Sequence, residues 1–100
     1  MLIAHVTFQT AAENRKKALD ALLFELPAVL AMPGCLKFQP YADPASPTRL
    51  GVVHEWEDAE SFAAYTASPG FARSGAVVRP LMTAPPVSRR FEAKLLEIVA

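Results

Sequence analysis

The sequence predicts an α+β fold in which two helices cover one face of a four-stranded antiparallel sheet. Two patterns support this prediction: segments in which apolar residues alternate, as in half-buried strands, and segments in which they recur at helical spacing. In chain order the segments read strand, helix, strand, strand, helix, strand. With 100 residues, 52% of them hydrophobic, the chain is expected to form one domain over residues 1–100.

The first half of the chain contains the first strand and the longer helix. The strand is predicted over residues 2–10, with a dry face made of Leu2, Ala4, Val6 and Phe8. The helix is predicted over residues 13–31 from the helical spacing of its leucines and valine. Pro27 should kink or divide this helix, and Pro33-Gly34 should end it.

The second and third strands are predicted over residues 36–41 and 50–57, joined by a proline-rich loop that allows an antiparallel hairpin. The third strand places four side chains on one face: Leu50, Val52, His54 and Trp56. Asp58 is a suitable N-cap for a helix over residues 59–67. Ser68-Pro69 then begins a second helical piece that extends to about residue 81.

A final strand is predicted over residues 87–96, with Val87, Phe91, Ala93 and Leu95 on its dry face. This completes the split βαβ, or ferredoxin-like, arrangement. The dry faces of all strands are expected to meet the helices. The opposite face keeps a half-apolar set of residues, namely Ile3, His5, Thr7, Cys35, Tyr41 and Val53. Because an open apolar face is unusual, a second copy is expected to cover it in a two-fold homodimer.

Composition excludes several classes of protein. The ten basic and ten acidic residues cancel, so no excess charge is available to bind nucleic acid. No signal peptide and no apolar stretch long enough for a membrane span is recognisable, which predicts a cytoplasmic protein without a membrane partner. Cys35 is the single cysteine and is expected to be a packing residue.

The predicted fold gathers Trp56, His54 and Tyr65 in one small region, because the third strand leads directly into the helix that packs over it. Trp56 could wall a site or fill the core, His54 could be a base or a core histidine, and Tyr65 could orient a substrate or simply pack. His5 and His54 lie on different strands and opposite faces, so no metal site is predicted. Three arginines are expected only to solvate strand ends: Arg49, Arg89 and Arg90.

Several motifs resemble the antibiotic-biosynthesis monooxygenase (ABM) family of dimeric α+β-barrel proteins. They are Pro33-Gly34-Cys35-Leu36, Trp56-Glu57-Asp58 leading to Phe62-Ala63-Ala64-Tyr65, Ser68-Pro69-Gly70-Phe71, and Leu81-Met82-Thr83 before a basic final strand. The resemblance implies a dimeric barrel and covers nearly the whole chain. The family includes oxygenases of quinols and polyketide quinones that use neither metal nor flavin, haem-degrading enzymes and an isomerase.

The chain departs from this family at two positions of the usual acid/base pair. Tyr65 stands where many relatives carry histidine, and His54 stands where glutamate is common, two residues before the strand tryptophan. Haem-degrading relatives use an axial histidine on the second helix, where this chain has Gly75. Haem degradation is therefore not expected.

The resulting hypothesis is a cofactor-independent monooxygenase that acts on a quinol or another hydroxylated aromatic compound. His54 would be its base and Tyr65 would orient a substrate oxygen. Trp56, Phe62 and Phe71 would contact the substrate, although core packing also explains the two phenylalanines. A non-catalytic dimeric binding module and a small isomerase on the same scaffold remain open alternatives. Oxygen uptake would separate the first hypothesis from the second.

Overall fold

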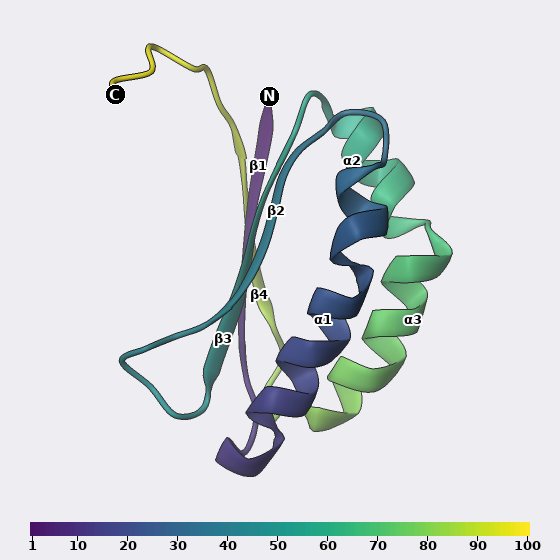
Figure 1. Ribbon diagram of the computed structural model, residues 1–100, viewed down its shortest axis with the longest axis vertical. Helices are drawn as coiled ribbons and strands as arrows, with labels where there is room; N and C mark the ends of the chain where they lie inside the picture. The colour runs from purple at the N-terminus through teal and green to yellow at the C-terminus, as the bar shows by residue number, and fades with distance from the viewer.

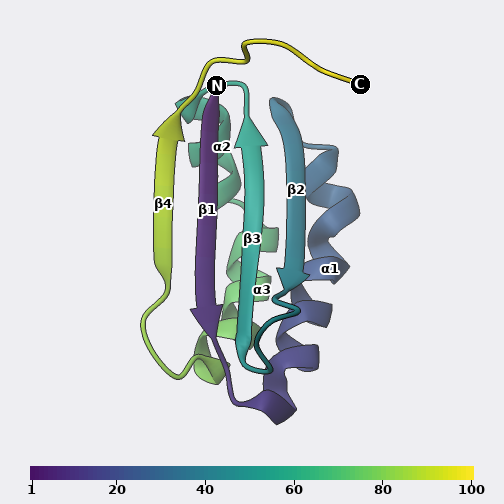
Figure 2. The same ribbon diagram turned by 90° about the vertical axis from the view of Figure 1, so that its left-hand side faces the viewer.

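One antiparallel sheet of four strands, in the order β2-β3-β1-β4, carries all the helices on one face (Figure 1). The computed structural model describes residues 1–100. Figure 2 shows the open face of the sheet with the helices behind it. The strands are β1 (Leu2–Gln9), β2 (Cys35–Ala42), β3 (Arg49–Trp56) and β4 (Val87–Glu92). The helices are α1 (Arg15–Leu30), α2 (Ala59–Thr66) and α3 (Pro69–Val78), with short 3-10 turns η1 (Ala12–Asn14) and η2 (Arg79–Leu81). The predicted ferredoxin-like class is confirmed.

The ends of α2 and α3 form as their capping residues predict. The Asp58 carboxylate accepts a hydrogen bond from the backbone N–H of Ser61 at 2.7 Å. The Ser68 hydroxyl accepts one from the N–H of Phe71 at 3.2 Å, and Pro69 occupies the first helical turn. Each cap satisfies a backbone donor that has no partner inside its helix. The two caps therefore define where α2 and α3 begin, and these two helices together roof the site described below.

The turn between α1 and β2 depends on Gly34. Its φ angle is +80°, a left-handed conformation that favours glycine. A Cβ atom there would also meet the Ser61 side chain of α2, so the turn and the helix lie in direct contact. Pro27, by contrast, does not divide α1, which continues as one helix to Leu30.

The strand register places His54 and Arg90 in one row across the sheet. Ala4 of β1 pairs with His54 of β3 on one side and with Arg90 of β4 on the other. Phe38 of β2 extends the same row beyond His54. All four side chains point to the helix side, because neighbouring residues in register share a face. Ala4 is fully buried and separates His54 from Arg90 within this row.

The expected orientation of the last strand is wrong. Val87 pairs with Thr7 and Phe91 pairs with Ile3, so both apolar residues lie on the open face of the sheet. Ser88 and Arg90 consequently face the helix side. Apolar and polar residues do alternate along β4 as predicted, but this alternation does not determine which side of the strand faces the helices. β4 is an edge strand whose residues are all exposed, so burial by helices does not select its apolar side.

Cys35 also lies on a different face from the one expected. It pairs with Trp56, and a register shift between Cys35 and Lys37 interrupts the alternation of β2 at this point. The bulge turns Cys35 toward the core, where it packs against buried residues. Burial raises the pKa of its thiol, which keeps it in the less reactive protonated form.

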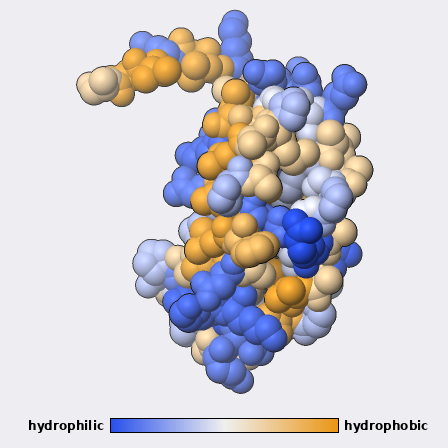
Figure 3. Space-filling view, turned by 45° about the vertical axis from the view of Figure 1, so that its right-hand side comes forward, coloured by the Kyte–Doolittle hydropathy of each residue, from blue (hydrophilic) through white to orange (hydrophobic).

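The predicted last strand is also too long, because β4 ends at Glu92. Residues 93–100 leave the sheet and project on the side away from the helices (Figure 1). In Figure 3 this tail stands apart from the body as a largely apolar arm. Its large apolar side chains are between 59% and 87% exposed, namely Leu95, Leu96, Ile98 and Val99. No helix has both the length and the apolar composition of a membrane span.

Candidate active site

A cavity of about 230 Å³ lies between the helix side of the sheet and the pair α2 and α3. The sheet supplies its floor through Val6, Phe8, Val52, His54, Ser88 and Arg90. The two helices supply its roof through Phe62, Tyr65, Thr66, Phe71, Ser74 and Gly75. Arg79, Met82 and Pro86 line it from the segment between α3 and β4, and Leu22 from α1. Four of the predicted site residues, His54, Phe62, Tyr65 and Phe71, therefore meet at one cavity.

His54 is held by a hydrogen bond that determines its tautomer. It is only 3% exposed, and its Nδ1 accepts from the indole N–H of Trp56 at 2.8 Å. An indole nitrogen can only donate, so Nδ1 carries no proton and the neutral ring carries its proton on Nε2. Nε2 has no hydrogen-bond partner within the chain. Because every fully buried side-chain nitrogen and oxygen has a partner, Nε2 is not itself fully buried. The Nε2–H group is therefore available to the cavity.

Burial keeps this histidine neutral. The loss of solvent, with a further contribution from the positive charge of Arg90, lowers the pKa of His54 from 6.5 to about 4. Aromatic rings surround it at centroid distances of 5.5 to 6.2 Å, belonging to Phe38, Phe62, Tyr65 and Trp56. At neutral pH His54 is consequently a hydrogen-bond donor toward the cavity. This geometry argues against the expected role as a base, because Nδ1 is occupied and Nε2 already holds a proton.

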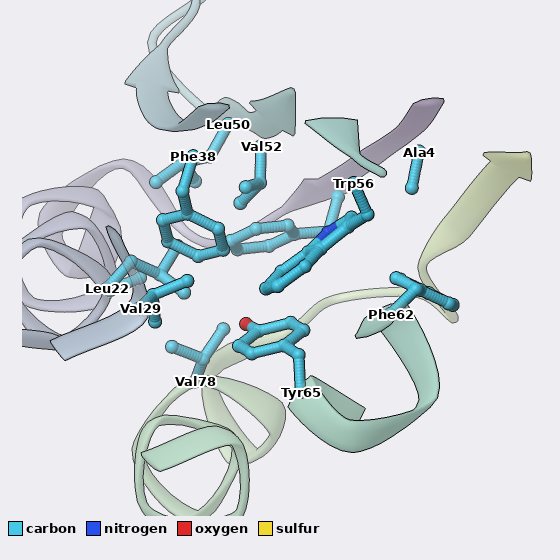
Figure 4. Packing of buried hydrophobic residues seen from close by; sticks show 12 residues of the cluster. Ala4, Leu22, Val29, Phe38, Leu50, Val52, Trp56, Phe62, Tyr65 and Val78 are labelled. Carbon is cyan, nitrogen blue, oxygen red and sulfur yellow. The ribbon is translucent and has the colours of Figure 1, made fainter. Parts of the chain in front are cut away.

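Tyr65 is the second donor at the cavity. Its ring is 5% exposed and stacks on the Trp56 indole, with centroids 5.3 Å apart and planes inclined by 22°. Figure 4 shows the two stacked rings, with the Tyr65 hydroxyl on the side of Val29 and Val78, away from Phe62. Burial, reinforced by the negative charge of Glu25, raises the pKa of Tyr65 to about 12. The phenol therefore stays protonated and can donate to a ligand oxygen.

Trp56 is not a wall of the cavity, contrary to the expectation. Its side chain is fully buried in the core and is absent from the cavity lining. It supports the site indirectly, because it orients His54 through a hydrogen bond and Tyr65 through stacking. Phe62 and Phe71 do line the cavity, so the aromatic surface offered to a ligand comes from the helices.

The sequence reasoning missed the two cationic residues of the cavity, Arg79 and Arg90. The Arg90 guanidinium lies 4.8 Å from the centre of the Phe62 ring and its Nε donates weakly to Ser88 at 3.4 Å. The signal that identifies Arg90 is the register of β4, which aligns it with His54 through Ala4. Alternation alone predicts Val87 and Phe91 on the helix side of the sheet, and therefore predicts that Arg90 is solvated. No three His, Cys, Asp or Glu side chains converge as a metal site would require.

The family model for antibiotic biosynthesis monooxygenase (ABM) matches residues 1–76. The chain belongs to this family. The match spans β1 to α3 and so includes most of the cavity, whereas β4 with Ser88 and Arg90 lies beyond it.

Solved structures share the fold at low sequence identity. A Deinococcus radiodurans protein described as a candidate antibiotic biosynthesis monooxygenase is 22% identical, with a TM-score of 0.88 and all of both chains covered. The Nitrosomonas europaea protein NE2512, of unknown function, is 20% identical, with a TM-score of 0.82 over 99% of this chain and 94% of its own. Rv0793 from Mycobacterium tuberculosis is 18% identical, with a TM-score of 0.85 and 98% of each chain covered. Among curated proteins, none matches the sequence.

Proposed function

We propose that this ABM protein binds a hydroxylated aromatic compound or quinol in the cavity and oxygenates it with O₂, without a cofactor. One observation carries the proposal: every titratable side chain at the cavity is a donor or a cation, namely His54, Tyr65, Arg79 and Arg90. Such a lining stabilises an oxyanion more than the neutral phenol, so it favours the form of the substrate that can give an electron to O₂.

The chemistry then needs no protein base. The substrate hydroxyl loses its proton to water at the cavity mouth. The anion accepts hydrogen bonds from His54 and Tyr65, and the positive charge of Arg90 stabilises it at longer range. The anion passes one electron to O₂, and the resulting superoxide and ring radical combine through a new C–O bond. The peroxide takes up a proton and its O–O bond breaks as water leaves with the ring hydrogen. A phenol and O₂ thus give a quinone and water, while the aromatic walls keep the radical pair together.

A His54→Gln variant separates the donor role from the base role. Glutamine can accept from the indole N–H with its carbonyl and donate to the substrate with its amide. If His54 is a donor, we expect turnover in an oxygen-electrode assay with a panel of hydroquinones to fall by less than about tenfold. Loss of a general base lowers turnover by roughly 10²–10⁴-fold, and such a fall would refute the donor role.

Two further variants complete this test. His54→Leu removes both hydrogen bonds and should abolish turnover, whereas His5→Gln on the open face should leave it unchanged. Thermal melts show whether each variant is folded. Binding of the hydroquinones without any oxygen uptake would reject oxygenation in favour of a binding module.

We also propose that the protein is a homodimer built on the open face of the sheet. That face presents Ile3 and Val53 together with the half-exposed Val87 and Phe91, and no helix covers it. The orientation found for β4 enlarges this apolar surface beyond the one expected from the sequence. The apolar tail over residues 93–100 leaves the sheet on the same side, where a second copy would shield it (Figure 1).

Light scattering at micromolar concentration tests the dimer. Ile3→Lys introduces a charge into the open face and should shift the mass toward that of the monomer. Phe24→Lys is the matched control, because Phe24 is 76% exposed on α1 and lies away from this face. A monomeric wild-type protein would refute the proposal.

A further inference from the structure

The cavity carries an unbalanced positive charge. Arg79 and Arg90 line it, no acidic residue does, and its histidine is neutral. Neither arginine forms an ion pair, since the ion pairs of the chain join Lys16 to Asp20 and Arg73 to Glu25. The carboxylate of Glu25 is buried beside the site, but Arg73 holds both of its oxygens at 2.5 and 2.9 Å. Arg90 also borders a neighbouring pocket that contains Glu57, Asp58 and Glu92, but none of these carboxylates lies within ion-pair distance of it. Both cavity arginines are therefore free to pair with an anionic ligand.

The cavity is also small. Its volume of about 230 Å³ is below the roughly 300–1,000 Å³ that is usual for drug-sized ligands. The rings of Phe62, Tyr65 and Phe71 line it, with Tyr65 and Phe71 edge to face at 5.3 Å. This size and lining suit a small ligand with one aromatic ring.

The positions of the polar groups indicate how such a ring would be substituted. His54 and Arg90 lie in one row of the sheet, two strands apart, with Ala4 between them in the row. Two interstrand spacings separate their backbones by roughly 10 Å. A single ring with a hydroxyl at one end and a carboxylate at the other is long enough to reach from the His54 donor to the guanidinium.

We propose that the cavity selects a single-ring hydroxylated aromatic carboxylate, whose carboxylate pairs with Arg90 and Arg79 and whose hydroxyl meets His54 and Tyr65. The part of this inference that concerns the hydroxyl rests on the proposed function, whereas the part that concerns the carboxylate rests on two cavity arginines that have no ion-pair partner. Arg90 is held against Phe62 by a cation–π contact, so its guanidinium is already ordered to form charge-assisted hydrogen bonds.

Calorimetric titration under nitrogen tests the selectivity without turnover. The probes are 4-hydroxybenzoate and 4-hydroxybenzamide, which have nearly the same shape but differ in charge. We expect the carboxylate to bind roughly 10- to 100-fold more tightly, since hydrogen bonds to charged groups contribute about that much. The preference should decrease as salt is added, because both arginines are exposed.

Arginine variants test whether the preference for the carboxylate probe comes from the cavity arginines. The double variant Arg79→Gln/Arg90→Gln should bind the two probes equally. Arg89→Gln is the matched control, because Arg89 is the neighbour of Arg90 on the opposite face of β4 and should retain the full preference. Equal binding by the wild type, tighter binding of the amide, or a preference that survives in the double variant would overturn the inference.

The test of carboxylate selectivity can fail or succeed independently of the test of oxygenation. Carboxylate preference without oxygen uptake would support this inference and reject the oxygenase. Oxygen uptake with neutral quinols and no carboxylate preference would leave the oxygenase intact and overturn this inference. Failure to bind either probe would overturn it as well.

Discussion

Each face of the sheet carries one histidine that is hydrogen-bonded to an aromatic side chain, and the two pairs differ in what they can do. On the helix side, His54 Nδ1 accepts from the Trp56 indole at 2.8 Å. On the open face, His5 Nε2 and the Tyr41 hydroxyl lie 2.7 Å apart. The indole can only donate, whereas a phenol hydroxyl can donate or accept. One tautomer is therefore imposed on His54, and either one suits His5.

The difference between the faces follows from the cover above them. Helices bury Trp56 completely and leave His54 only 3% exposed, so this pair is shielded from bulk solvent. His5 is half-buried and Arg89 pairs with it across the strands on a face that no helix covers. The same kind of pair thus serves a defined cavity on one side and an adaptable surface on the other.

The largest difference should appear when an aromatic side chain is removed from each face. Trp56→Ala should lower the free energy of unfolding by about 3–5 kcal/mol, because it leaves a large cavity in the core. Phe91→Ala on the open face should have an effect that shrinks as the protein is diluted, because it acts through association. Urea unfolding at several protein concentrations measures both effects. If the effect of Trp56→Ala depended on concentration instead, the assignment of the faces would be reversed.

The second-largest difference should appear in how the free energy of unfolding depends on pH, because the pKa of His54 is strongly lowered. The folded pKa of His54 is about 4 and therefore lies below its ordinary 6.5, so the unfolded state takes up the proton first as the pH falls. The free energy of unfolding should decrease between these pH values by about 3 kcal/mol through His54 alone. Urea unfolding as a function of pH should show this decrease in the wild type and in His5→Gln, but not in His54→Gln. Parallel curves for all three proteins would contradict the assignment.

The smallest effect concerns the two tyrosine hydroxyls. Tyr41→Phe removes the hydrogen bond to His5 and should lower the free energy of unfolding by about 0.5–1.5 kcal/mol. The Tyr65 hydroxyl has no partner in the chain, so Tyr65→Phe should change stability less while it weakens ligand binding. A Tyr65→Phe variant that is destabilised more than Tyr41→Phe would show that the Tyr65 hydroxyl has a structural partner.

Much of the fold could be predicted from local patterns. Asp58 and Ser68 identified the two helix starts, and Pro33-Gly34 identified the end of the long helix, because caps and left-handed glycines act within a few residues. The alternation in β3 placed His54 beside Trp56 on the helix side. These features depend on neighbours in sequence, which a single chain displays directly.

The errors arose where pairing between distant segments decides the outcome. Arg90 faces the cavity because β4 pairs with β1 in one particular register, and no local pattern states that register. Cys35 faces the core because a bulge interrupts the alternation of β2. The hydrogen bond from Trp56 that leaves the proton of neutral His54 on Nε2 requires a particular rotamer of each ring, which spacing along a strand does not specify.

The hydrogen bond between Trp56 and His54 also has an optical consequence. Trp56 is the only tryptophan, so the intrinsic fluorescence of the chain at long wavelength comes from this single position. An imidazolium has no lone pair to accept from the indole N–H, so protonation of His54 must break the bond between them. The emission of the native protein is therefore a built-in label for the charge state of one buried histidine, and it requires no attached dye.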